Sequence, residues 1–525
     1  MVLQRSMQVP VWGWAEAGEK ITVSIDQQTK TCTADPAGKW MVRLDPMETG
    51  TPRKMTVKGK SGALEITDIL LGEVWLCSGQ SNMAWPLKQA MNGQQEVAEA
   101  IYPEIRLFDV PNAMDSKVPL ERLQNNNPIV QKNYCIWRPC SPDTAKDFSA
   151  VAYFFGRDLH QALHVPVGLI NNSVGGSPIV AWISHSALMA DSDFKVVAQY
   201  FDGLAHYVEN TPKGKRDLEA RSAEYDAKQA EARAKDKPPL WPPKYLGPVK
   251  SWGFGCSLFN ALINPLIPYG MRGAVWYQGE AEWQWMYEYR GIFPVLIKDW
   301  RSRWGQGAFP FLFVQLPNWS NPSPEPDSGG WALIRESQLA TLKLPNTGMA
   351  VTIDVGEAAS IHPIDKQDVG ERLSLAARGV VHGEKIVYSG PIYREMKVEG
   401  HSIRLSFDHV GSGLMVGKKS ALQPTVEDQA GPLKRFAIAG EDNKWVWGDA
   451  RIDKNTVVVS SPAVPKPVAV RYAWANNPEG CNLYNKDGLP ASPFRTDTTQ
   501  PGPSTQMGAF YKSKLEKGFS LTPVK

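Results

Sequence analysis

A repeated succession of strand-like and helix-like segments between about Leu70 and Val380 constrains the fold of this chain more than any other feature. The strand-like segments are mainly apolar, and they are Glu73–Cys77, Val167–Asn171, Gly273–Tyr277, Pro310–Leu316 and Gly348–Ile353. The helix-like segments are Ser149–Leu163, Leu258–Ile267, Tyr289–Trp304, Trp331–Leu342 and Lys366–Val380. Apolar strands that alternate with helices are typical of a parallel sheet with helices on both faces. We therefore predict an α/β fold with a mainly parallel sheet for this part of the chain.

Both ends of the chain have a different pattern, that of short strands separated by turns that contain Gly or Pro. Near the N-terminus the expected strands are Val9–Trp14, Lys20–Asp26, Lys39–Leu44 and Arg53–Lys58. Near the C-terminus they are Ile403–Phe407, Phe436–Ala439, Thr456–Ser460 and Val468–Trp474. A chain of 525 residues also exceeds what one hydrophobic core normally serves. We expect β-rich regions of sandwich or jelly-roll type over 1–69 and 383–497, the α/β region over 70–382, and a tail over 498–525. The pattern leaves open whether the two ends merge into one sandwich.

One segment interrupts the alternation of strands and helices. Lys213–Lys237 is rich in Ala, Glu, Lys and Arg, and a Pro-rich stretch follows it. Charges of opposite sign spaced four residues apart favour an exposed helix. We predict a helical insertion over about 211–250, which we interpret as a solvated arm in preference to a partner-binding device.

The charge balance gives no reason to propose nucleic acid or an anionic membrane as a partner. Lys and Arg number 57 against 54 Asp and Glu, a net charge of +3, which is too small an excess for either surface. No apolar run reaches membrane-spanning length. No signal peptide is visible, but the chain opens directly in strand-like sequence, as a mature or truncated chain would. We expect a secreted or periplasmic protein, whose oligomeric state the sequence leaves open.

The six cysteines are too sparse for a disulfide scaffold and include no CxxC pair of the kind that binds a metal. Cys135 and Cys140 are close enough in sequence to bridge, although sequence alone does not show that they do. We therefore expect no metal and no other cofactor.

Ser81 stands immediately after the expected strand Glu73–Cys77, in the sequence LCSGQSNMAWP. A serine at this place presents its hydroxyl at the carboxyl edge of the sheet, where α/β proteins bind ligands. Its backbone N–H begins a helix and is a natural donor to an oxyanion. The segment is not the nucleophile elbow GxSxG, because Met83 replaces the second glycine. Taken alone, such a serine is more often a turn or cap residue.

Three further strand ends carry polar or glycine-rich sequence. The pair Gly175–Gly176 follows one strand, Gln278 and Glu280 follow another, and His362 lies in the loop after the last strand. Each has an ordinary structural explanation by itself: a tight turn, strand-end polarity, or a surface loop. Strand carboxyl ends converge in space, however. Together with Ser81 they supply a nucleophile, a general base and donors for a tetrahedral oxyanion, which is the equipment of acyl transfer.

Several stretches closely resemble the sialate O-acetylesterase family of the SGNH hydrolases. They are GQSNM, GLINNSVGGSPIVAW, MRGAVWYQGEA and IHPIDKQDVGERL, with the opening MVLQR and VPVWGWA and the later AGEDNKW, VRYAWANNPEGCNLYN and GLPASPFRTD. The resemblance runs from residue 1 to about Asp497. It implies a flavodoxin-like α/β/α domain, a β-rich accessory region and no metal. It also implies removal of acetyl groups from sugars, either sialic acid or plant cell-wall polysaccharides such as xylan and xyloglucan.

Carried over by position, the resemblance makes Ser81 the nucleophile and His362 the base. It places Gly175 and Gln278 with the Ser81 N–H in the oxyanion hole. Many SGNH enzymes have an Asp three residues before the His, but Ala359 stands there. The orienting acid is then Asp354, which we favour because it ends the last expected strand, or Glu357; alternatively a backbone carbonyl holds His362 as part of a dyad.

Substrate contacts and other functions complete these hypotheses. We assign substrate binding to Gln80, Trp276 and Glu280, and some of the 19 Trp side chains are suited to stack on sugar rings. One alternative is a glycoside hydrolase with Glu280 and Glu282 as paired carboxylates. Another is a carbohydrate-binding protein without catalysis. Intact Ser81 and His362 argue against the latter.

Overall fold

A mainly parallel sheet runs through the centre of the structure, a computed structural model that describes residues 1–110, 116–123, 135–235, 255–326, 329–498 and 506–519. Its strands lie side by side in the order β9-β8-β10-β7-β11-β12-β13, and all neighbours are parallel except β8 and the edge strand β9. Their bounds are β7 Gly62–Gly79, β8 Tyr102–Asp109, β9 Trp137–Cys140, β10 Val167–Ser173, β11 Gly273–Tyr277, β12 Phe311–Gln315 and β13 Thr347–Val351. The predicted α/β fold is confirmed.

Helices cover both faces of this sheet, so that strands β10, β11 and β12 are buried on both sides over almost all of their residues. On one face, Trp75 of β7 packs edge-on against Phe155 of α4, with ring centroids 5.1 Å apart. On the other, Trp276 of β11 packs edge-on against Trp300 of α8 at 5.8 Å. The covering helices are α4 Ala150–Leu163 and α10 Gln367–Ala376 on the first face, and α8 Tyr289–Trp304 and α9 Gly330–Ala340 on the second.

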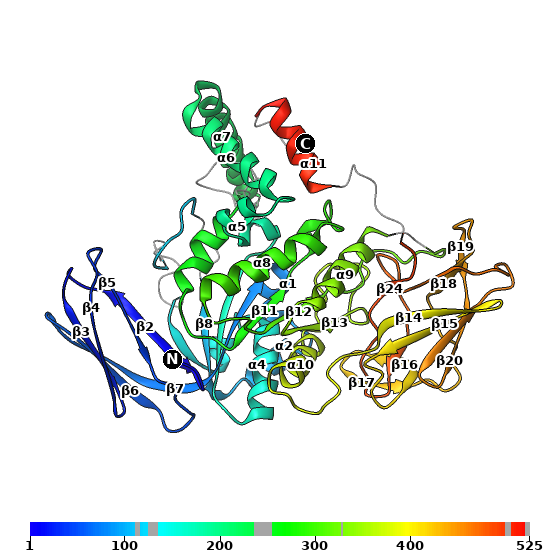
Figure 1. Ribbon diagram of the computed structural model, residues 1–525, viewed down its shortest axis with the longest axis horizontal. Helices are drawn as coiled ribbons and strands as arrows, with labels where there is room; N and C mark the ends of the chain where they lie inside the picture. Colours follow the sequence, from blue (N-terminus) through cyan, green and yellow to red (C-terminus); the bar gives the residue numbers. More distant parts are fainter. Residues whose placement is uncertain (111–115, 124–134, 236–254, 327–328, 499–505, 520–525) are drawn as a thin grey trace.

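The strands at the start of the chain form a β-rich unit with its own core, which lies to the left of the central sheet in Figure 1. Its strands are β1 Val2–Gln4, β2 Val9–Trp14, β3 Lys20–Ile25, β4 Gln28–Thr33, β5 Lys39–Leu44 and β6 Arg53–Gly59. Strand β7 belongs to both units: its first half pairs with β6, and its second half pairs with β10 and β11. The boundary that we expected between 69 and 70 therefore falls inside one continuous strand of 18 residues.

The C-terminal β-rich region lies on the opposite side of the central body, so the two ends do not merge (Figure 1). It forms three small sheets, in the orders β14-β15-β21-β20, β17-β16-β23 and β19-β18-β22-β24. Its core is continuous with that of the α/β body. The bounds are β14 Ile392–Glu399, β15 Ser402–Asp408, β16 Leu414–Ser420, β17 Gln423–Glu427, β18 Phe436–Ala439, β19 Trp445–Trp447, β20 Asp449–Asp453, β21 Thr456–Ser460, β22 Ala469–Tyr472, β23 Leu483–Asn485 and β24 Phe494–Arg495.

The predicted helical insertion is present as α7, Pro212–Ala234, which packs against α6, Lys195–Asn210. Pairs four residues apart, Lys228–Glu224 and Lys235–Glu231, lie at 2.7 and 2.5 Å, as predicted. The rest of the insertion, 236–250, lies outside the described residues. The tail contributes a helix that we did not predict, α11, whose Tyr511 packs against Tyr200 of α6 at 5.0 Å. The remaining described α-helices are α1 Ser81–Ala84, α2 Gly93–Ala98, α3 Pro142–Ala145, α5 His185–Ala190 and α11 Met507–Lys517.

Candidate active site

Ser81 and His362 meet at the carboxyl end of the central sheet, although 281 residues separate them. The Ser81 Oγ lies 2.8 Å from Nε2 of His362, so the hydroxyl can donate to the ring nitrogen. Ser81 is the first residue of α1, directly after β7. Gly79 makes this turn possible, because its φ is +138° and a Cβ there would lie 2.1 Å from the backbone oxygen of Tyr277. The sequence prediction that these strand ends converge is confirmed for this pair.

The imidazole of His362 is held by packing and by its own loop. The ring stacks on Trp85, with centroids 5.3 Å apart and planes inclined by 23°. The backbone N–H of His362 donates to Ser360 Oγ at 3.1 Å. Burial lowers the pKa of His362, and the positive charge of Lys366 lowers it further. A lowered pKa keeps the ring neutral near neutral pH, as a general base must be.

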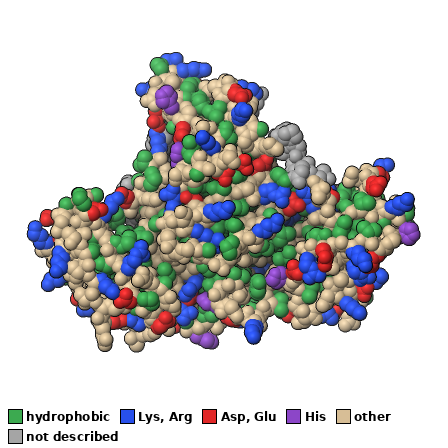
Figure 2. Space-filling model, in the orientation of Figure 1, with side chains coloured by type: hydrophobic (Ala, Val, Ile, Leu, Met, Phe, Trp, Pro, Cys, Tyr) green, Lys and Arg blue, Asp and Glu red, His purple; other side chains and the backbone are tan. Residues whose placement is uncertain are grey.

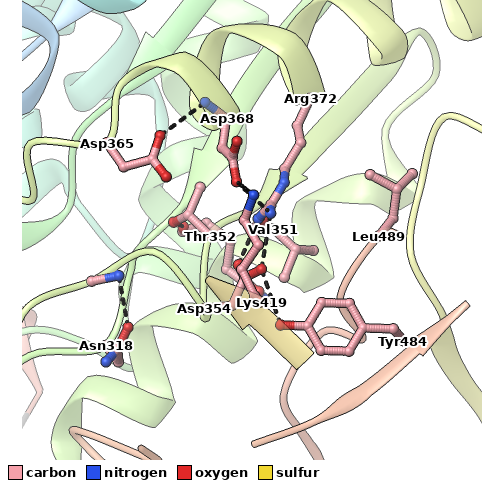
Figure 3. A network of polar contacts seen from close by, with 12 residues as sticks. Asn318, Val351, Thr352, Asp354, Asp365, Asp368, Arg372, Lys419, Tyr484 and Leu489 are labelled. Atoms are coloured by element: carbon pink, nitrogen blue, oxygen red, sulfur yellow. Dashed lines mark hydrogen bonds and ion pairs between the residues drawn. The ribbon is translucent and has the colours of Figure 1, made fainter. Parts of the chain in front are cut away.

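Asp354 does not orient His362, which corrects our preferred expectation. Both of its oxygens are bound by the Arg372 guanidinium of α10, at 2.6 and 2.9 Å, and the Tyr484 hydroxyl donates to one of them at 3.1 Å. Figure 3 shows Asp354 inside this network, which also contains Asp368 and Lys419. The physical reason is that a buried carboxylate three residues beyond the end of β13 lies directly against a buried guanidinium, and a bidentate ion pair satisfies both charges.

Glu357, the alternative acid, is engaged within the same loop. Its carboxylate accepts the N–H of Ile364 at 2.9 Å. Among the described residues, none forms a hydrogen bond with Nδ1 of His362. The structure therefore brings a serine and a histidine together, but places neither expected carboxylate on the ring.

The Gly175–Gly176 pair forms the turn that follows β10. The last residue of this strand, Ser173, lies beside Gly79 in register, and the N–H of Val174 donates to the Gly79 oxygen at 3.0 Å. Gly176 has a φ of +69°, which suits glycine. The pair thus follows the strand beside β7, at the same sheet edge as Ser81.

Gln278 is fully buried, and its side chain is fully engaged. Its Nε2 donates to the Ser177 oxygen at 3.3 Å and to Glu282 at 3.2 Å, while its Oε1 accepts from the Tyr289 hydroxyl at 2.8 Å. An amide nitrogen has only two hydrogens to donate. Gln278 therefore reaches an oxyanion only by giving up one of these bonds.

Of the three expected substrate contacts, Trp276 is buried in the core. Its ring packs between Trp182 and Trp300, and 1% of the residue is exposed. This position corrects the expectation, because alternate residues of β11 point to opposite faces and Trp276 points under α8. Gln80 lies beside Ser81, where its Oε1 accepts the N–H of Ala281 at 3.1 Å.

Glu280 belongs to a buried polar network that the sequence did not reveal. Asn82 is its centre: Nδ2 donates to Glu280 at 2.5 Å and to the Ile361 oxygen at 3.0 Å, and Oδ1 accepts from Lys366 Nζ at 2.6 Å. Asn82 follows Ser81 and Ile361 precedes His362, so one amide ties the nucleophile to the base. The sequence feature that could have indicated this network is Lys366, which lies four residues after His362.

Burial dominates the electrostatics of this network. Lys366 is completely buried, and desolvation lowers its pKa to about 7, against the opposing charge of Glu280. Burial also raises the pKa of Glu280. Lys366 lies 5.8 Å from the centroid of the Trp85 ring that stacks on His362. A charge of this kind is close enough to influence proton transfer at the site.

The carboxylates required by a glycoside hydrolase are not available in a cleft. Glu282 is buried and accepts the N–H of Ile179 at 2.6 Å, and Glu280 is engaged by Asn82. Glycosidase mechanisms need two carboxyl groups that flank the scissile bond. The geometry therefore favours the serine and histidine as the reacting groups.

The described part of the chain holds neither a cluster of metal-ligating side chains nor a disulfide. No group of three or more His, Cys, Asp and Glu side chains there is arranged to hold a metal ion. All six cysteines lie in the described ranges and are free thiols, so Cys135 and Cys140 do not form a bridge.

No described helix is long and apolar enough to cross a membrane. Figure 2 shows cationic and anionic side chains interspersed over the described part of the face it presents.

Comparisons with known proteins bear on the same site. Residues 248–376, which include Gln278 and His362, match the family model described as carbohydrate esterase, sialic acid-specific acetylesterase. The chain is 31% identical to the human sialate O-acetylesterase, over 96% of this chain and 92% of that protein, and 30% identical to the mouse one, over 96% and 93%. A solved carbohydrate acetylesterase from Xanthomonas citri is similar in structure, with a TM-score of 0.76, 37% identity and coverage of 95% of this chain and 97% of that one. The chain therefore belongs to the sialate O-acetylesterase family of carbohydrate esterases.

Proposed function

We propose that this protein is a carbohydrate O-acetylesterase that works through an acetyl-enzyme on Ser81. The observation that carries the proposal is the 2.8 Å contact between Ser81 Oγ and His362 Nε2, in a chain whose relatives are named as acetylesterases. The substrate class is an acetylated sugar, either sialic acid or a plant cell-wall polysaccharide such as xylan or xyloglucan.

The reaction has two steps. In the first, Ser81 Oγ attacks the acetyl carbonyl while its proton passes to Nε2 of His362, and His362 gives that proton to the departing sugar oxygen. In the second, water attacks the acetyl ester on Ser81, its proton passes through His362 to the Ser81 oxygen, and acetate leaves. The neutral imidazole that burial and Lys366 favour is the form that the first step requires.

The tetrahedral oxyanion in this proposal is stabilised by the N–H groups of Ser81 and Gly175. Both follow adjacent parallel strands at one edge, and the Ser81 N–H lies at the start of α1. Gln278 joins them by exchanging its 3.3 Å bond to the Ser177 oxygen. His362 acts as part of a dyad, oriented by the Trp85 stack and Ser360 in place of an acid.

The proposal also covers architecture and location. With β8 and β9 set aside, the strand order β10-β7-β11-β12-β13 is that of flavodoxin-like sheets, which supports an SGNH-type catalytic domain. We retain as proposals the expected divisions at 69/70, which lies inside the shared strand β7, at 382/383 and at 497/498, as well as a secreted or periplasmic location. Expression of 70–382 alone tests the division, and cell fractionation tests the location.

The test is acetate release from p-nitrophenyl acetate and from a panel of acetylated glycans. Ser81→Ala and His362→Ala are each expected to lower kcat by about a thousandfold or more. Ser78→Ala is the matched control, because Ser78 lies in the same strand and its hydroxyl has no partner in the described structure. Full activity of Ser81→Ala in a folded protein would rule the proposal out.

A further inference from the structure

A polar cavity of about 610 Å³ opens beside α1 at the carboxyl edge of the sheet. Its walls come from the ends of β8 and β10, from β9 and from α3, and it reaches Ala84, the last residue of the four-residue helix that Ser81 begins. The volume is within the range of small-molecule sites. The wall residue Ala84 is three residues after Ser81 in the same helix, so this part of the cavity lies near the nucleophile, although Ser81 itself is not among the wall residues.

The cavity wall carries an ordered row of polar groups. Ser173 Oγ donates to Asn171 at 2.8 Å, Asn171 Nδ2 donates to Asp109 at 3.0 Å, and Arg138 Nη2 donates to the other oxygen of Asp109 at 3.1 Å. These bonds hold each side chain in place before a ligand arrives. Towards sugar hydroxyls, a fixed guanidinium donates, a carboxylate accepts, and an amide does both.

The charged groups of the cavity wall are three aspartates and two cations, and each cation lies against one of the aspartates. Of the described charged groups in the wall, Arg138 pairs with Asp109, and Lys146 lies 3.7 Å from Asp143. The third acid, Asp147, pairs at 2.7 Å with Lys88, which lies outside the wall. A ligand carboxylate would thus meet an excess of acidic groups, because the wall holds three aspartates and only two cations. Such an arrangement disfavours an anion and tolerates a neutral ligand.

We infer that this cavity is the subsite for a neutral sugar unit of an acetylated glycan, and that it selects against the carboxylate of sialic acid. The inference rests on the proposed acetylesterase function and narrows its substrate class. Asp109 is its central residue, because both of its oxygens are fixed by Asn171 and Arg138 and the side chain borders the cavity.

The first measurement compares kcat/KM of the full chain on acetylated xylo-oligosaccharides, acetylated cello-oligosaccharides and O-acetylated N-acetylneuraminic acid, with p-nitrophenyl acetate as the reference. We expect the better neutral glycan to exceed the sialic acid by about tenfold or more, since one unfavourable charge contact has roughly that effect. Equal or faster hydrolysis of the sialic acid would overturn the inference. No hydrolysis of any of these esters would instead contradict the proposed function.

The second measurement uses Asp109→Asn, which keeps the shape of the side chain. We expect the ratio of kcat/KM on the neutral glycan to that on p-nitrophenyl acetate to fall by about tenfold. The matched control is Asp158→Asn on α4, since Asp158 is also paired with an arginine and burial raises its pKa to about 6, as it does for Asp109. Asp158 does not line the cavity. An unchanged ratio in Asp109→Asn, or an equal fall in both variants, would overturn the inference.

Discussion

Replacing Lys366 by methionine removes the positive charge nearest to the base in the buried network. In the native protein this charge lowers the pKa of His362. The pKa of Lys366 itself is lowered to about 7, so the ammonium is charged throughout the acidic range in which His362 titrates. We therefore expect Lys366→Met to raise the pKa of His362 and to move the acid limb of the pH–rate profile upward.

The size of the shift follows from two contacts with one ring. His362 and Lys366 lie 5.3 and 5.8 Å from the Trp85 centroid, so Nζ is at most about 11 Å from the imidazole centroid. At that distance and an effective dielectric constant of about 20, two unit charges interact by about 1.5 kcal/mol. One pKa unit corresponds to about 1.4 kcal/mol. The expected upward shift is therefore about one pKa unit, or more where the groups are closer.

The assay is kcat/KM for p-nitrophenyl acetate from about pH 5 to about pH 8. Glu280→Gln combined with Lys366→Met is the matched control, because it also removes the carboxylate that Lys366→Met leaves buried without its counter-charge. In both variants the acid limb of the pH–rate profile should lie at higher pH than in the native protein. A limb that stays in place, or moves to lower pH, in a folded variant would refute the electrostatic role of Lys366.

Two further predictions concern the scaffold of the site. Arg372→Met should lower the free energy of unfolding by about 3–5 kcal/mol, because it leaves Asp354 and Asp368 buried without their guanidinium; denaturant unfolding that shows less than about 1 kcal/mol would contradict the described pairing. Gly79→Ala should reduce both stability and activity, since its Cβ would clash with the Tyr277 oxygen; activity at the native level would show that the strand end does not need a glycine.

The sequence predicted the layers of the fold because apolar content and periodicity report burial. Tyr289–Trp304 has the same bounds in α8 as in the prediction, and Gly273–Tyr277 the same as in β11. The exposed first part of β7 gave no such signal, because its residues 62–68 have almost no buried face. The helix Met507–Lys517 was missed because contacts with α6 stabilise it, and these are absent from local sequence.

The candidate site was predictable where chemistry stands at strand ends, as for Ser81 and His362. It was not predictable where a side chain's direction or a distant partner decides its role. Trp276 and Gln278 stand near the same strand end, yet packing under α8 buries the first and Tyr289 engages the second. Asp354 is bound partly by Tyr484, which lies 130 residues later in the chain.

The most direct measurement of the central claim is mapping of an organophosphonate probe that labels activated serines. A hydroxyl 2.8 Å from the His362 imidazole should react, so peptide mass mapping should find the adduct on Ser81 alone, and not at all in His362→Ala. Labelling of a different serine, or undiminished labelling of Ser81 without the histidine, would contradict the account.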